Sequence, residues 1–177
     1  MKHFIILILF TSFISSCSRN SNNRSLNAED VRKFEERNIE INKEIVKRKQ
    51  DTIQSFIALH KWDMKKTGSG LWYYIKTNGN NDSIKSGDFV EFSYTVSLLN
   101  GKVCYSSDSL GRKTIKVGQG GIESGVEEAL LMMHKGDSAR LLIPPHLAHG
   151  LIGDQNKIPK LAILNYTLVI TNYKKKE

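Results

Sequence analysis

The amino-acid sequence predicts an α+β fold, with an antiparallel β-sheet wrapped around one short helix and an N-terminal helical arm before it. Apolar and polar residues alternate along 90–98, 139–143 and 164–170, as in strands that bury one face. A single short helical pattern, 124–134, interrupts these strands. The stretch 27–62 contains neither proline nor glycine and repeats apolar residues at helical spacing. Strands around one helix indicate the α+β class.

Composition and charge fit one ordinary domain with appendages. The chain has 177 residues, of which 40% are hydrophobic, enough for one modest core. The formal charge is +8, but the basic residues are scattered and only Lys174–Lys176 form a run. We therefore expect no nucleic-acid partner. The pair His146-x-x-His149 lacks an assured third ligand, so we expect no metal site, and no motif indicates a cofactor.

Residues 1–16 predict a lipoprotein signal peptide. Lys2 precedes the apolar run 4–10, which is too short for a permanent membrane span. The segment Ile14-Ser15-Ser16-Cys17 resembles the bacterial lipobox, which implies that Cys17 is diacylated and becomes the mature N-terminus. A plain signal peptide that happens to contain a cysteine is the alternative. The resemblance implies a lipid-anchored protein in the cell envelope of a diderm bacterium, at the outer membrane and facing the periplasm.

Residues 17–26 are expected to form the lipidated cysteine and a flexible polar tether, and residues 27–66 a helical arm. Asn27 has the character of an N-cap, because acidic residues follow in the first turn. A break into two helices near Gln50–Asp51 is an alternative to one continuous helix. The apolar stripe of the arm is Val31, Phe34, Ile41, Ile45, Ile53, Phe56 and Ile57. It has to pack on the domain, on another copy or on a partner, so a dimer through the arm is one prediction.

Residues 67–173 are expected to form the domain, and residues 174–177 a basic tail. Asn100-Gly101 is a strong hairpin signal between two of the strands, and Gly136 ends the helix. The expected elements are strands Leu71–Thr77, Val90–Leu98, Lys102–Ser107 and Thr114–Val117, the helix Ser124–His134, a strand through Ala139–Ile143 and a last strand within Leu161–Asn172.

The stretch Gly136–Gly150 carries the most specific motif in the chain. Its strand stops at Pro144-Pro145, which cannot continue a ladder, and a short apolar loop follows. The run GDSARLLIPPHLAHG resembles the signature of FKBP-type peptidyl-prolyl isomerases, with His149 where that family has tyrosine. The resemblance covers about Thr67 to Tyr173. The stretch Gly150–Leu168, with its run Gly153–Ile158, most resembles the FKBP-type lipoproteins associated with bacterial gliding motility.

The resemblance implies a prolyl-binding pocket without a nucleophile. Its aromatic walls are Tyr94 and Tyr166, its floor is Ile122 and Val126, and its rim is Ile158. The hydrogen-bonding groups are the His149 side chain and the backbone N–H of Glu123. Cys104 and Tyr105 stand where the family has Phe-Asp. This last departure predicts a pocket that lacks its carboxylate. Val126 replaces a bulkier residue of the family pattern, which predicts a shallower or differently filled floor.

Two functions follow from the resemblance. One is an isomerase that assists the folding of exported proteins and acts on proline-containing polypeptide clients. The other is a catalytically inactive chaperone or assembly subunit that binds proline-containing segments. With Cys17 assigned to the lipid anchor, Cys104 is left without a partner for a disulfide and is expected to be a core residue.

Overall fold

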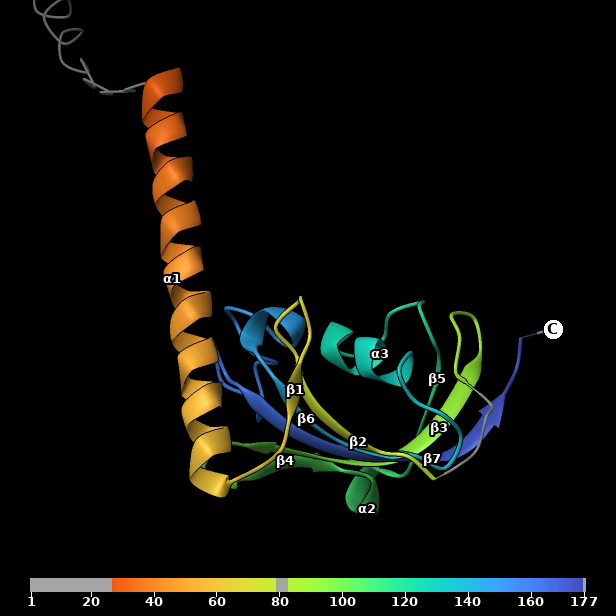
Figure 1. Ribbon diagram of the computed structural model, residues 1–177. Helices are drawn as coiled ribbons and strands as arrows, with labels where there is room; N and C mark the ends of the chain where they lie inside the picture. The colour runs from red at the N-terminus through yellow and green to blue at the C-terminus, as the bar shows by residue number, and fades with distance from the viewer. Residues whose placement is uncertain (1–26, 79–82, 177) are drawn as a thin grey trace, which may run out of the picture. The chain divides into compact units, whose positions relative to one another are not determined.

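The computed structural model describes residues 27–78 and 83–176 of the chain. Cys17, the predicted lipidation site, lies outside the described residues. The chain divides into two compact units, Met1–Asn38 and Ile39–Glu177. The second unit contains the sheet, its helices and the predicted site (Figure 1).

The first element is the helix α1, Ala28–His60. Asn27 caps it as predicted, because its Oδ1 accepts a hydrogen bond of 2.7 Å from the Asp30 backbone N–H. The helix runs without interruption through Gln50–Asp51, so the alternative of a break there was wrong. Among the helices of residues 27–78 and 83–176, none is both long and apolar enough to cross a membrane.

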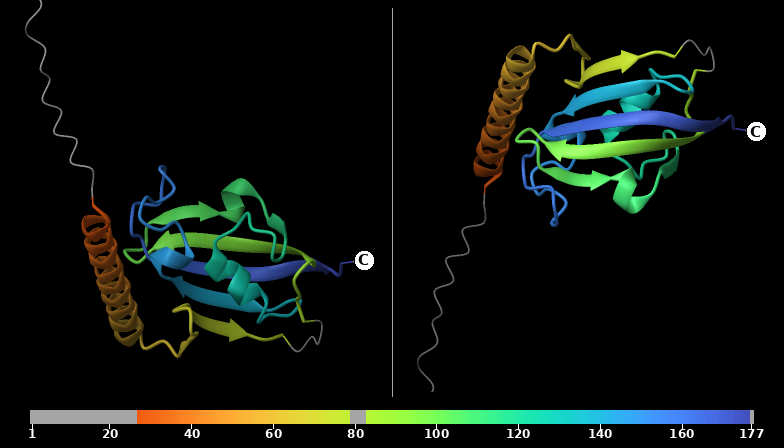
Figure 2. Two further views of the ribbon diagram at one scale, coloured as in Figure 1. Left: turned by 90° about the horizontal axis from the view of Figure 1, so that it is seen from above. Right: turned by 90° about the horizontal axis from the view of Figure 1, so that it is seen from below.

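Within the described residues, seven antiparallel strands form one sheet with the order β1-β2-β6-β7-β3-β4, and β5 also pairs with β3 (Figure 2). The strands are β1 Lys65–Lys66, β2 Trp72–Lys76, β3 Phe89–Leu98, β4 Val103–Ser106, β5 Lys113–Lys116, β6 Ser138–Ile143 and β7 Leu164–Lys174. The longest pairing joins β3 and β7, from Phe89 opposite Lys174 to Leu98 opposite Leu164. The two strands that carry the predicted tyrosines are therefore neighbours in the sheet.

The main core lies between the sheet and the helix α3, Ser124–Leu130 (Figure 1). Val126, Ala129 and Leu130 of α3 are fully buried in this core. The helix is shorter than predicted, because the backbone N–H of Ile84 donates to Met133 O at 3.1 Å and Ser83 pairs with His134. These pairings draw the chain after α3 toward a β-bridge. The predicted α+β class, a sheet around one short helix, is confirmed.

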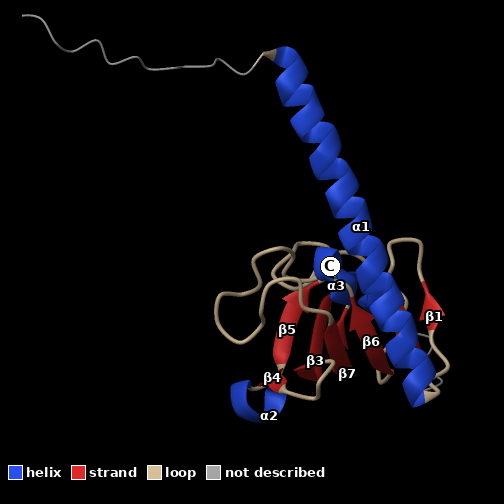
Figure 3. Ribbon diagram, turned by 90° about the vertical axis from the view of Figure 1, so that its left-hand side faces the viewer, coloured by secondary structure: helices blue, strands red, loops and turns tan. Residues whose placement is uncertain are grey.

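A second, smaller core joins α1 to the sheet. Ile53 and Ile57 of α1 pack with Leu142 of β6 and Ile163, and all four are buried. Figures 2 and 3 show this part of α1 beside the end of the sheet where β6 stops and β7 begins. Leu142 lies on the face of β6 that the alternation assigns to solvent. An apolar residue on that face is explained by the helix that covers it.

Three short elements do not appear in the sequence prediction. Strand β1 pairs Lys65 with Tyr73 and Lys66 with Trp72. The one-turn helix α2 spans Ser107–Leu110, where a turn was expected, and the 3-10 helix η1 spans Pro145–Leu147. Elements of two to four residues cover only about one period of the apolar pattern, so no repeat is available to reveal them.

Candidate functional site

The two predicted aromatic walls stack on each other. The ring centroids of Tyr94 on β3 and Tyr166 on β7 are 5.9 Å apart, with 23° between the ring planes. Tyr166 is only 1% exposed, whereas Tyr94 is half-buried. Burial raises the pKa of Tyr166 far above its usual value, and the nearby Glu123 and Tyr94 raise it further. The Tyr166 hydroxyl is therefore neutral at physiological pH.

The predicted floor and rim belong to the same core as these rings. Val126 is fully buried and Ile158 is 2% exposed, while Ile122 packs against them from a half-buried position. Gly125 brings α3 close to β6, because a Cβ atom there would lie 2.6 Å from Ile143 Cγ2. The start of α3 is thus held against the strand that leads into the loop with His149.

We call residues 145–150 the site loop; they begin with η1 and end at Gly150. The Gly150 N–H donates to Pro145 O at 2.8 Å, which closes the loop on itself. Ser124 Oγ donates to Leu147 O at 3.2 Å, which attaches the loop to the start of α3. The His149 side chain lies against Glu123, with 3.2 Å between Nε2 and Oε1. Since the carboxylate accepts this hydrogen bond, His149 Nε2 carries the hydrogen.

The structure corrects the expectation that the site lacks a carboxylate. Tyr105 Oη donates a short hydrogen bond to Asp154 Oδ2. Asp154 Oδ1 accepts two more, from the backbone N–H of Asn156 at 2.9 Å and of Ile158 at 2.8 Å. Asp154 therefore brings a carboxylate to Tyr105 from a segment 49 residues away in the chain.

The pKa of Asp154 reflects these contacts. Burial raises it, but the hydrogen bonds from Tyr105 and the two backbone N–H groups, with the charge of His149, outweigh burial and leave the pKa below its ordinary value. The hydrogen bond to Asp154 in turn raises the pKa of Tyr105, and burial adds to the effect. At neutral pH the pair is a carboxylate and a neutral phenol. The sequence signal for Asp154 is the Asp-x-Asn run after Gly153. Such a run is typical of a turn in which the aspartate side chain accepts hydrogen bonds from backbone N–H groups that follow it.

Cys104 is a buried core residue, as predicted. Its side chain is 2% exposed, and Sγ lies 3.5 Å from the Lys157 carbonyl oxygen. Burial is the largest influence on the thiol and raises its pKa. The thiol is therefore neutral at physiological pH, and a neutral buried thiol is inert as a nucleophile. Lys157 also places its Nζ 5.1 Å from the centroid of the Tyr105 ring.

The structure thus brings the predicted site residues together from three regions. Aromatic rings come from β3 and β7, apolar side chains come from α3 and from Ile158, and polar groups come from the site loop, Glu123 and Asp154. Within residues 27–78 and 83–176 no group of three or more His, Cys, Asp or Glu side chains is placed to hold a metal ion. Apolar walls with a few hydrogen-bonding groups suit the binding and distortion of a chain segment.

A model of the family described as FKBP-type peptidyl-prolyl cis-trans isomerase matches residues 80–170, just over half of the 177 residues. The chain belongs to this family. The match includes every predicted residue of the prolyl-binding pocket, from Tyr94 to Tyr166. The roles of these residues in binding stay predictions.

Curated relatives agree with the family. A Haemophilus influenzae protein named "Probable FKBP-type peptidyl-prolyl cis-trans isomerase" is 35% identical over 108 residues, which are 61% of this chain and 44% of that protein. Human "Peptidyl-prolyl cis-trans isomerase FKBP9" is 33% identical over 85 residues, or 48% of this chain and 15% of that protein. This chain therefore spans less than half the length of these relatives.

Solved structures agree with the fold. The crystal structure of FkpA from Escherichia coli superposes with a TM-score of 0.64 at 24% identity, covering 92% of this chain and 76% of that one. The crystal structure of AtFKBP13 superposes with a TM-score of 0.59 at 26% identity, covering 64% of this chain and all of that one. The FkpA match extends beyond the family-model region, but at this identity it concerns the fold alone.

Proposed function

We propose that this protein is a membrane-anchored peptidyl-prolyl isomerase that assists the folding of exported proteins. The observation that carries the proposal is the stacked pair Tyr94 and Tyr166, in one core with Val126 and next to the Glu123–His149 pair. Such a site offers a proline ring apolar contacts and offers the neighbouring amide hydrogen-bonding groups. Its clients would be proline-containing polypeptides.

The reaction needs no covalent step. Rotation about a peptide bond loses amide resonance and meets a barrier of about 18–20 kcal/mol. An apolar environment and donors aimed at the twisted carbonyl lower this barrier. In the proposed complex the proline ring packs against the half-buried Tyr94 and Ile122, with the buried Tyr166 and Val126 beneath them. The Glu123 backbone N–H and His149 Nε2–H donate to client carbonyl groups. His149 would exchange its contact with Glu123 for one with the client.

A protease-coupled assay on a proline-containing peptide, with a soluble form of residues 18–177, tests the activity. We expect Tyr94→Leu to lower kcat/KM by about two- to tenfold, because an aromatic pair contributes about 0.5–1.5 kcal/mol beyond its burial. Tyr74→Leu is the matched control, since Tyr74 is 49% exposed on β2. A rate for the unmodified protein no faster than in buffer would refute catalysis.

The membrane anchor is a separate part of the proposal. The lipobox-like run that ends at Cys17 supports lipidation and attachment to the outer membrane facing the periplasm. The run Gly153–Ile158 supports the finer assignment to the gliding-motility-associated lipoproteins. Metabolic labelling with an alkyne fatty acid should mark the protein, and Cys17→Ala should abolish both the label and its membrane fractionation. Labelling that persists in Cys17→Ala would contradict this assignment.

A second candidate is a non-catalytic chaperone or assembly subunit, favoured by exposed apolar residues that follow the site loop and by others on α1. Leu151 and Ile152 are 59% and 70% exposed, and Ile39 and Ile41 of α1 are 55% and 48% exposed. Suppression of citrate synthase aggregation without isomerisation would favour this candidate. The exposed residues of α1 also support a dimer through the arm, which sedimentation of the soluble form at several concentrations tests directly.

A further inference from the structure

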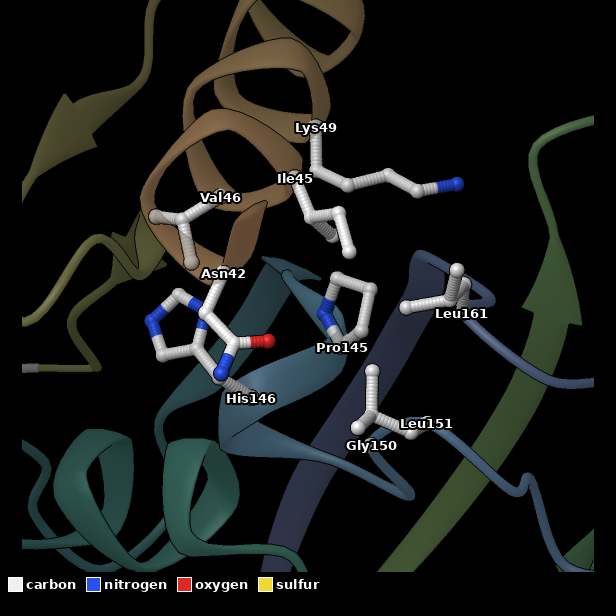
Figure 4. Close-up of a pocket in the computed structure, with 9 residues that line it drawn as sticks. All are labelled: Asn42, Ile45, Val46, Lys49, Pro145, His146, Gly150, Leu151 and Leu161. Atoms are coloured by element: carbon white, nitrogen blue, oxygen red, sulfur yellow. The ribbon is translucent and has the colours of Figure 1, made fainter. Parts of the chain in front are cut away.

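The site loop is held from two sides. On one side the start of α3 is attached to it through Ser124 Oγ and through Glu123, which contacts His149. On the other side lies the part of α1 that follows Ile39 (Figure 4). The position of His149 therefore depends on what fixes the loop on its α1 side as well as on its α3 side.

Apolar packing between the loop and α1 is incomplete. A cavity of about 220 Å³ lies between them. Figure 4 shows Ile45 and Val46 of α1 on one side of this space, with Pro145 and His146 on the other. A gap of this size forfeits the close contacts by which side chains normally fix a loop.

A chain of hydrogen bonds spans the same interface beside the cavity. Gln50 of α1 donates from Nε2 to Gly70 O at 2.8 Å, and its Oε1 accepts from Trp72 Nε1 at 2.9 Å. His146 of the site loop lies 2.9 Å, through Nε2, from Ser69 O. Since a carbonyl only accepts, His146 Nε2 carries the hydrogen here. The turn Ser69-Gly70 thus receives one hydrogen bond from the arm and one from the site loop.

The backbone of Gly70 permits this approach. Its φ is +100°, and a Cβ atom there would lie 2.5 Å from Gln50 Nε2 and 3.7 Å from His146 Cε1. Only glycine takes this conformation without strain and leaves room for both side chains. The turn is also attached to α3, because Ser69 Oγ donates to Glu128 Oε2 at 2.7 Å. The turn therefore connects the arm, the site loop and α3.

We propose that Gln50 and His146 are positioning residues, which through the Ser69-Gly70 turn hold the site loop, and with it His149, in the arrangement the reaction requires. The catalytic part of this inference rests on the proposed isomerase function. The arm then acts on the site through these hydrogen bonds, in addition to its apolar contact with the sheet. Neither residue touches a client in this scheme.

The test uses the full-length chain in detergent micelles and two readouts. Hydrogen exchange followed by mass spectrometry reports on the peptide that contains residues 145–150, where the Gly150 N–H is bonded to Pro145 O. The protease-coupled assay reports kcat/KM. Gln50→Ala and His146→Ala should each speed exchange in this peptide and lower kcat/KM by about two- to tenfold, the range of one net hydrogen bond.

Three variants separate positioning from general destabilisation. Gln54→Ala, exposed one turn further along α1, should leave both readouts unchanged. His146→Gln, which keeps a side-chain N–H donor, should recover most of the loss seen in His146→Ala. The double variant Gln50→Ala/His146→Ala should lose less than the product of the two single effects, because both act through one turn.

Unchanged exchange in the site loop of both alanine variants would overturn the proposal, whatever their activity. The proposal would also be overturned if His146→Gln lost as much activity as His146→Ala. It would likewise fail if kcat/KM of the alanine variants fell only in proportion to a lower unfolding temperature. If the unmodified protein shows no isomerisation, the proposed function fails, and the exchange readout alone still decides whether Gln50 and His146 hold the loop.

Discussion

Replacing Asp154 by asparagine tests the polar side of the site. The Asp154 carboxylate accepts one hydrogen bond from the Tyr105 phenol and two from backbone N–H groups, those of Asn156 and Ile158. Asparagine keeps the shape and one acceptor oxygen but loses the charge. Its Nδ2 group would also face Tyr105 Oη, so the phenol would have to accept a hydrogen bond instead of donating one.

The size of the effect follows from these contacts. A hydrogen bond to a charged group contributes about 1.5–3 kcal/mol, and one between neutral groups about 0.5–1.5 kcal/mol. Because Asp154 is only partly buried and two backbone bonds survive in neutral form, we expect Asp154→Asn to lower the free energy of unfolding by about 1–2 kcal/mol at pH 7. For a chain of this length the midpoint temperature should fall by about 2–8 °C.

The difference should depend on pH in one direction. The folded-state pKa of Asp154 lies below its ordinary value of 3.8, so its stabilisation is fully present above that value. It is lost as the pH falls through the folded-state pKa, because the carboxylate is then protonated in both the folded and the unfolded state. The difference in stability between the unmodified protein and Asp154→Asn should therefore shrink as the pH is lowered below 3.8.

Urea unfolding of both proteins across this pH range measures the difference, with Asp63→Asn as the control at an exposed aspartate. The control should change stability by less than about 0.5 kcal/mol. Equal midpoints for the unmodified protein and Asp154→Asn at pH 7 would refute the reasoning. So would a difference that stays the same at low pH, because it would then not come from the ionised carboxylate.

Three further predictions concern packing and reactivity. Ile53→Ala should lower the free energy of unfolding in urea by about 2–4 kcal/mol, because Ile53 is fully buried against the sheet. The control Leu59→Ala should change it little, because Leu59 is 78% exposed. Gly125→Ala should lower the free energy of unfolding by about 1–3 kcal/mol, since its Cβ would lie 2.6 Å from Ile143 Cγ2. In the control Gly68→Ala the new Cβ meets no atom within 4 Å, so the free energy of unfolding should hardly change. The buried Cys104 thiol should react with iodoacetamide at pH 8 at least about tenfold more slowly in the folded protein than in urea; equal rates would contradict its burial and raised pKa.

Much of the fold could be predicted because its longer elements have a clear period. The alternation in β3 and β7 places Tyr94 and Tyr166 on the same face, and their adjacency then follows from the pairing of the two strands. The proline pair that ends β6 marks the loop with His149. Local signals of this kind needed no knowledge of distant contacts.

The remaining features depend on contacts between distant segments. The sequence does not show that Leu142 packs under α1, although an apolar residue on an otherwise polar strand face is the relevant signal. Asp154 reaches Tyr105 across 49 positions, and a turn motif alone does not show where its carboxylate points. The hydrogen bonds of Gln50 and His146 to one turn likewise join segments with no common motif.

The contact between α1 and the sheet has a consequence for the order in which the chain is made. Ile53 and Ile57 pack on Leu142 and Ile163, which come about 90 to 110 positions later in the chain. At about 5–20 residues per second, synthesis takes roughly 5–20 s to supply these partners. During this interval the apolar stripe of the nascent arm has no domain to cover it. The arm is synthesised before the residues on which it packs, so a chain truncated before β6 should expose this stripe to any chaperone that binds apolar helices.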